Sequence, residues 1–222
     1  MTTLIERLIP RRMGRRSSAA DSSAERIPVN IAQTPNGKPS LLYVDQSDIY
    51  WGSIDGMWLP LTYERETDTY LFEGQPVKPR GTVENSVNSF SIITRVLGER
   101  YKITQALTGT EAYRMIKNSA PDVLLLSSSI GQLDEKELSE LERIGIEADP
   151  RNPPAKILLD YAEHLRLLGH NTHIGMVLGN DDTQWLHEWQ LDRGRPIQPK
   201  IYRPLDERTL KVELNLGNYQ KP

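Results

Sequence analysis

The chain has 222 residues, a formal net charge of −3 and no cysteine. This length is enough to bury a hydrophobic core, and the lack of cysteine excludes disulfides, thiolate metal sites and a cysteine nucleophile. The small net charge gives no general attraction to nucleic acid. No apolar run is long enough to form a membrane-spanning helix. The composition therefore predicts a cytoplasmic protein without a transmembrane segment.

Residues 1–38 are predicted to be a disordered basic tail. An amphipathic stretch ends at Pro10, and a segment rich in serine and alanine follows it, which cannot bury enough apolar surface to fold. Four arginines lie between them: Arg11, Arg12, Arg15 and Arg16. Because arginine clusters suit phosphates and carboxylates, the tail is either a solvated arm or an arm that contacts an acidic protein, a membrane surface or nucleic acid.

The remainder, residues 39–222, is predicted to be one domain that begins with a buried strand. Residues 41–45 (LLYVD) are apolar up to Asp45. Residues 47–84 then form a β-rich insert, because Asp55-Gly56 separates two aromatic runs and Asp-Gly is a strong hairpin signal. We expect a hairpin or small meander here. Its aromatic residues, Trp51 and Trp58 among them, form either its own small core or a face that anchors a partner.

A helix–strand–helix–strand series follows the insert. Residues 85–97 carry apolar side chains at helical spacing, and residues 101–104 alternate as a half-exposed strand does. Thr108 can cap a second helix, with Glu111 in its first turn. Residues 123–126 are then an unbroken apolar run, typical of a central parallel strand that is covered on both faces.

The pattern over residues 101–127, Gly-x-Glu-Ala followed by Ala-Pro-Asp and an aliphatic run, resembles the receiver domain of bacterial response regulators. The resemblance implies an α/β fold, a doubly wound five-stranded parallel sheet with strand order 2-1-3-4-5, as in flavodoxin. The β-rich insert and the basic tail would be additions to that fold. A further helical and proline-rich insert is expected at about residues 134–155.

The resemblance also implies where a phosphorylation pocket would lie, and this chain departs from the family there. Ser127 stands where active receivers carry the aspartate that accepts the phosphoryl group. Asp45 matches one member of the acidic pair that holds magnesium, whereas Gln46 replaces the other. Arg203, before Pro204, replaces the family's lysine. One carboxylate is a poor magnesium site, so we expect no catalytic residue, no metal and no cofactor.

The second half of the chain supplies the remaining elements. A strongly patterned helix is predicted over residues 157–168, a fourth strand over 173–178 and a fifth over 197–203. Between the last two strands, Trp185 and Trp189 lie one turn apart on a helix. In receivers this region commonly carries the output contact. The two indoles are therefore either a partner-binding patch or part of the core.

Phosphoryl transfer to an aspartate needs a nucleophile, a metal and a cation together. The sequence therefore predicts a pseudo-receiver, a phosphorylation-independent protein–protein interaction module in two-component signal transduction, rather than an enzyme. The alternative is a structural or accessory subunit of a larger assembly that uses the receiver fold as a scaffold. The identity of the protein partner does not follow from the sequence.

Overall fold

The structure is a computed structural model that describes residues 37–46, 48–179 and 183–214, all within one unit spanning residues 31–222. The predicted tail, with Arg11, Arg12, Arg15 and Arg16, lies outside the described residues apart from its last two positions. The strands are β1 (Ser40–Val44), β2 (Ile49–Ile54), β3 (Met57–Glu64), β4 (Thr69–Phe72), β5 (Gln75–Val77), β6 (Arg80–Asn85), β7 (Lys102–Ala106), β8 (Val123–Ser127), β9 (His173–Leu178) and β10 (Lys200–Tyr202). The helices are α1 (Ser86–Leu97), α2 (Gly109–Asn118), α3 (Glu135–Arg143), α4 (Pro154–Leu167), α5 (Thr183–Arg193) and α6 (Glu207–Glu213).

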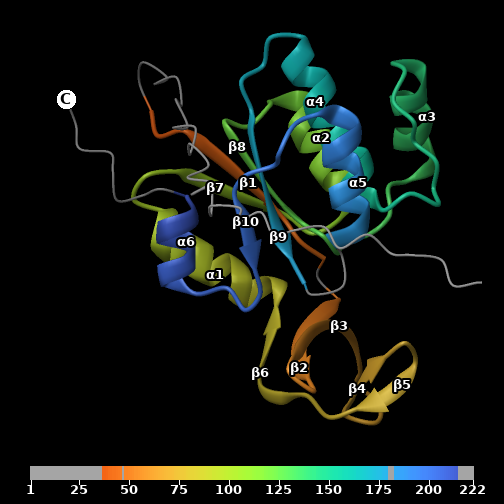
Figure 1. The fold of residues 1–222 in the computed structure, drawn as a ribbon, viewed down its shortest axis with the longest axis vertical. Helices are drawn as coiled ribbons and strands as arrows, with labels where there is room; N and C mark the ends of the chain where they lie inside the picture. The colour runs from red at the N-terminus through yellow and green to blue at the C-terminus, as the bar shows by residue number, and fades with distance from the viewer. Residues whose placement is uncertain (1–36, 47, 180–182, 215–222) are drawn as a thin grey trace, which may run out of the picture. The chain divides into compact units, whose positions relative to one another are not determined.

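The first sheet is parallel and has the order β10-β9-β8-β1-β7 (Figure 1). Counted along the chain without the insert, this is the predicted order 2-1-3-4-5, and the flavodoxin-like, receiver-like fold class is confirmed. The central strand β8 pairs with β1, with Val123 opposite Leu41 at one end and Leu126 opposite Val44 at the other. Every residue of β8 is buried, as the unbroken apolar run predicts.

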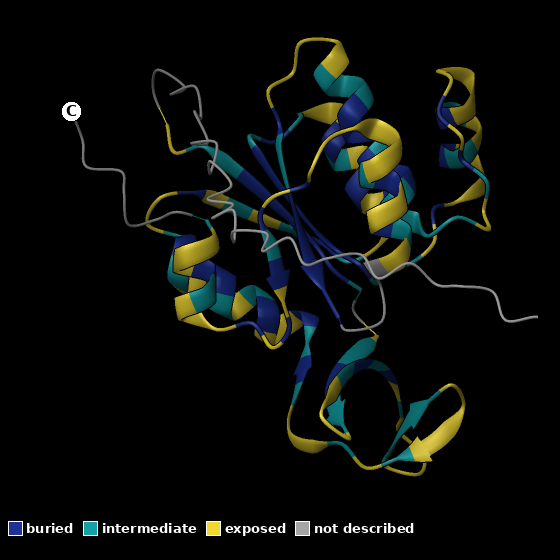
Figure 2. Ribbon diagram, in the orientation of Figure 1, coloured by how far each residue is buried: buried dark blue, intermediate teal, exposed yellow. Residues whose placement is uncertain are grey.

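Helices cover both faces of this sheet, and the strand residues alternate between two apolar clusters. Leu42, Val44, Leu124 and Leu126 belong to the cluster formed with α2, α4 and α5. The intervening residues, such as Leu41 and Leu125, belong to the cluster with α1 and α6. Figure 1 shows these two helix layers, and Figure 2 shows the buried strands between them.

The β-rich insert is a second sheet, antiparallel, with the order β5-β4-β3-β2-β6. The Asp55-Gly56 turn between β2 and β3 is present, with φ angles of 50° and 86°. Such a pair of positive φ angles is typical of the two-residue hairpin turn that Asp-Gly favours. The sheet is larger than the expected hairpin or small meander, because β6 continues after the proline-containing connection and pairs with β2 at Tyr50 and Asn85.

The segment between β8 and β9 contains two helices. Helix α4 is the one that packs on the sheet, since its Leu158 and Leu159 are fully buried, and it begins at Pro154, where a missing N–H costs nothing. Helix α3 is the additional element in the region that the sequence marked as an insert. Strand β10 is shorter than predicted, because only residues 200–202 pair with β9. None of the helices in the described ranges is long and apolar enough to span a bilayer.

Candidate functional site

Three of the four predicted pocket positions meet at the carboxyl edge of the parallel sheet. Asp45 follows β1, Ser127 ends β8, and Arg203 follows β10. All three side chains are buried. The ends of β1 and β8 are neighbours, and Arg203 reaches them from β10, which lies two strands away from β8. Gln46 is not part of this cluster. Its side-chain amide lies beside Gly131 in the loop after β8, where a Cβ on Gly131 would be 3.7 Å from Cδ of Gln46.

The carboxylate of Asp45 is largely occupied by partners within the chain. Its Oδ2 accepts hydrogen bonds from the Tyr43 hydroxyl at 2.6 Å and from Nη2 of Arg203 at 2.9 Å. Its Oδ1 accepts from the backbone N–H of Gln46 at 3.1 Å. Nη2 of Arg203 also reaches Oγ of Ser127, at 3.3 Å. The guanidinium therefore lies between Asp45 and Ser127, two of the four pocket positions predicted from the sequence.

The other side of the guanidinium is bound by the insert and by α1. Nη1 of Arg203 donates to Oγ of Ser89 at 3.0 Å and lies 3.4 Å from Oε1 of Glu84. The Ser89 hydroxyl in turn donates to the same Glu84 oxygen at 2.9 Å. The backbone N–H of Leu205 donates to both Glu84 oxygens. Glu84, in β6, thus links the insert to the chain that leaves β10.

Trp51 of β2 covers Arg203. The guanidinium carbon lies 4.7 Å from the centroid of the indole ring, and both side chains are fully buried. A desolvated contact of this kind contributes about 2 kcal/mol. We call Arg203, Asp45, Glu84, Ser89, Ser127, Tyr43 and Trp51 the arginine cluster. It is a buried polar cluster at the carboxyl edge of the parallel sheet.

Burial and charge shift the pKa values in the arginine cluster. Burial, together with the neighbouring Asp45, raises the pKa of Tyr43 well above its usual value, so the phenol stays neutral and donates. Burial also raises the pKa of Glu84, and Arg203 only partly offsets it. For Arg203, burial opposes the charge, but Tyr43, Asp45 and Glu84 outweigh it and raise the pKa. The guanidinium is therefore permanently charged.

The chemistry that this arrangement allows is limited. A serine is a weak nucleophile without a general base, and Ser127 accepts from a cation rather than donating to a base. A magnesium ion needs several oxygen ligands in an octahedron, whereas Asp45 already bonds three donors. Within the described residues, no group of three or more histidine, aspartate and glutamate side chains is placed to hold a metal ion.

The four tryptophans predicted as partner contacts fall into two groups. Trp51 and Trp189 are buried within the chain, with exposed fractions of 0% and 4%. Trp189 packs in the apolar cluster formed with α2, α4 and α5. It also donates its indole N–H to Asp160 at 3.0 Å, so it belongs to the core. Trp58 in β3 and Trp185 in α5 are partly exposed. Only these two leave indole surface for a partner.

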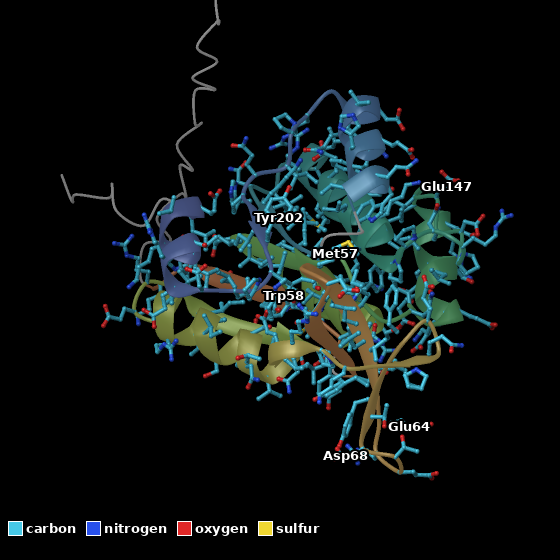
Figure 3. All side chains as sticks on the ribbon, turned by 60° about the horizontal axis from the view of Figure 1, so that its bottom comes forward. Met57, Trp58, Glu64, Asp68, Glu147 and Tyr202 are labelled. Carbon is cyan, nitrogen blue, oxygen red and sulfur yellow. The ribbon has the colours of Figure 1, made fainter. Side chains whose placement is uncertain are left out.

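A surface hollow of about 410 Å³ lies where α5 meets β10. Its lining is mixed: Leu178, Gln184, Leu186, His187, Lys200 and Tyr202. Tyr202 is half exposed, and it is labelled in Figure 3 together with Met57 and Trp58 of the insert. This hollow is separate from the arginine cluster, because Tyr202 and Arg203 are successive residues of an extended chain and point to opposite sides.

The sequence did not predict Glu84, Ser89 or Tyr43 as members of the cluster. Arg203 is the one signal in the sequence that points to a residue such as Glu84. A buried guanidinium needs anionic partners, and the sequence indicated only one carboxylate for it, Asp45. Which carboxylate supplies the second contact depends on how the insert folds back. That cannot be deduced from spacing, since Glu84 and Arg203 are far apart in the chain.

No protein-family model matches the sequence, and no curated protein is similar to it at a significant level. Among solved structures, a response regulator receiver domain protein from Clostridium thermocellum matches with 11% identity and a TM-score of 0.39 over 80% of this chain and 92% of that chain. A CheY-like receiver domain protein from Methanospirillum hungatei JF-1 matches with 13% identity and a TM-score of 0.41 over 80% and 92%. It is the strand order and register, rather than these overall similarities, that define the fold.

Proposed function

We propose that this chain is a pseudo-receiver, a phosphorylation-independent module that binds a protein partner in a signalling or regulatory process and has no catalytic activity. The observation that carries the proposal is the arginine cluster. The position of the family's acceptor carries Ser127, and the side chain that faces it is a guanidinium held by Asp45 and Glu84. Trp51 covers the guanidinium, and both Asp45 and Ser127 already bond to it, which supports a role that does not depend on phosphorylation.

The partner surface that we propose is the hollow between α5 and β10 with its partly exposed aromatic surroundings. Tyr202 lines the hollow, and Trp185 follows the lining residue Gln184 on α5. Half-exposed aromatic residues are the usual anchors of protein interfaces. Trp58 of the insert is a further candidate contact. Trp189, on the buried side of α5, packs in the core beneath this surface, whereas Trp51 belongs to the arginine cluster.

Phosphorylation is the direct test of the first part. The full chain is incubated with acetyl phosphate and magnesium, with an active receiver as the positive control, and the intact mass and the amide NMR spectrum are recorded. We expect no added phosphate and no magnesium-dependent shift at Asp45 or Ser127. A phosphate mapped to Ser127, Ser128 or Ser129 would refute phosphorylation independence.

The interaction is tested with the Tyr202→Ala variant, because its side chain is half exposed and its loss leaves the core intact. Partners captured by the wild-type chain should lose about tenfold or more in affinity, since an interface aromatic often contributes more than about 1.4 kcal/mol. The melting temperature should be unchanged. The matched control is Tyr101→Phe, which alters a buried tyrosine and should leave binding unaffected. Equal binding by Tyr202→Ala and wild type would exclude this surface.

A further inference from the structure

The insert carries a row of three tyrosines on one face of its sheet. Tyr63 of β3 lies directly opposite Tyr70 of β4, and Tyr50 of β2 lies opposite Leu61, two residues from Tyr63. Residues opposite each other in an antiparallel pair share a face. The ring centroids are 5.1 Å apart for Tyr63 and Tyr70, and 5.7 Å and 5.6 Å from Tyr50 to each of them. We call Tyr50, Tyr63 and Tyr70 the tyrosine row.

The tyrosine row faces away from the arginine cluster. Trp51 and Glu84, which contact Arg203, are paired with each other on the opposite face of the insert. On the tyrosine face, Pro79 covers part of the sheet, because a Cβ on Gly52 would lie 2.8 Å from both Pro79 Cβ and Leu61 Cδ1. Leu61 is accordingly buried, whereas all three tyrosines remain partly exposed. Among the residues that the structure describes, none covers this part of the sheet face completely.

The surroundings of the tyrosine row are acidic. Residues 48–84 include seven acidic and three basic side chains. The Tyr63 hydroxyl donates to Asp68, and Glu64 accepts from Thr67, so two exposed carboxylates are held at the β3–β4 turn. Figure 3 shows Glu64 and Asp68 at the same end of the hairpin. A ligand that lies along the row would meet these carboxylates at one end.

We propose that the tyrosine row binds an extended peptide segment of a partner protein that contains proline and arginine. Proline-rich segments dock on aromatic side chains with little loss of entropy. The three ring centroids form a triangle with sides of 5.1, 5.7 and 5.6 Å, so the rings present one compact aromatic patch for such a segment to cross. A guanidinium stacks on a tyrosine ring and pairs with a carboxylate. This chain already packs such a segment, Lys78-Pro79-Arg80, beside the row. The proposal rests on the proposed function as an interaction module.

The test uses the full chain and three synthetic peptides, four repeats each of Arg-Pro-Pro, Gln-Pro-Pro and Arg-Gly-Gly. Affinity is measured by calorimetry, and the contacted residues are located by NMR. We expect the Arg-Pro-Pro peptide to bind about tenfold or more tightly than either other peptide, because only it offers both the ring stacking and the charge. Its amide shifts should map to β2, β3 and β4.

Three variants locate the site. Tyr70→Ala should weaken binding about fivefold to tenfold, in the range of a truncated interface aromatic. Glu64→Gln combined with Asp68→Asn should weaken it and reduce its salt dependence. These two residues are in an exposed turn, so this variant tests the site even if Tyr70→Ala perturbs the insert. Leu167→Ala, which removes an exposed apolar side chain of α4 outside the insert, is the control and should bind as wild type does.

Several outcomes would overturn the inference. Equal affinity for the Arg-Gly-Gly peptide would show attraction by charge alone. Unchanged affinity in both variants, or no binding of the Arg-Pro-Pro peptide, would exclude the row as its site. Concentration-dependent self-association that Tyr70→Ala abolishes would mean that a second copy of the chain occupies it. The proposed function is tested separately from these outcomes. It would still stand if the chain were not phosphorylated and bound a partner through Tyr202.

Discussion

The parallel sheet and the insert sheet both have five strands, but different forces hold them. The parallel sheet lies between two apolar clusters, and its central strand β8 is completely buried. The insert has few fully buried apolar residues, chiefly Trp51, Leu59 and Leu61, and its strand β4 is half exposed throughout. A small sheet of this kind needs outside support. Here the support is polar, since Glu84 and Trp51 bind Arg203.

The largest loss of folding stability should come from removing the side chain of Arg203, which connects the insert to the parallel sheet. Arg203→Ala leaves Asp45 and Glu84 buried without their cation, which typically costs about 3–5 kcal/mol. We expect this loss in chemical denaturation, with amide exchange accelerated most in β2 and β6. The matched control, Arg208→Ala, removes an exposed arginine and should change stability by less than about 0.5 kcal/mol. Equal stability of the two variants would mean that Arg203 does not support the insert.

Truncating a side chain in the apolar core should lower the stability nearly as much, but it should accelerate amide exchange in different strands. Leu125 of β8 is fully buried, and Leu125→Ala removes its apolar contacts and leaves a cavity, for about 3 kcal/mol. Because the parallel sheet is one cooperative core, exchange should accelerate in β1, β8 and β9 together. Faster exchange confined to the insert would contradict this distinction between the two sheets.

A smaller, pH-dependent effect should come from Glu84. Because burial raises its pKa above 4.5 in the folded chain, its contribution to stability is most favourable below about that pH and is lost as the pH rises through the raised value. Glu84→Gln should flatten this part of the stability–pH curve. The comparison is made by urea denaturation across the range from pH 4 upwards. A curve identical to that of wild type would show that Glu84 does not titrate as described.

The smallest loss of stability is expected for a truncation in β4, the partly exposed strand of the insert. Leu71 of β4 is only partly buried, so Leu71→Ala should cost about 1 kcal/mol or less, well below Leu125→Ala. Thermal melting of the two variants side by side is sufficient to rank them. A loss at Leu71 as large as that at Leu125 would mean that the insert is part of the main core.

The sequence predicted the parallel sheet well, because its strands are short apolar runs whose order follows from the resemblance at residues 101–127. It also located Asp45, Ser127 and Arg203, since parallel strands bring their carboxyl ends to one edge. It could not place Trp51. Whether that indole faces Arg203 or solvent depends on the register of β2, and a shift of one residue would turn it to the other face. The burial of Trp189 was likewise open, because helical spacing shows which residues share a face but not what that face contacts.

The pairing of Tyr50 with Asn85 has a consequence for the modularity of the chain. It places the start and the end of the insert on neighbouring strands, about 5 Å apart. Residues 50–85 could therefore be excised and the gap closed with a short linker, and no strand of the parallel sheet would have to be rethreaded. Such a shortened chain would lose Trp51 and Glu84 together. Its guanidinium would face water above Asp45 and Ser127.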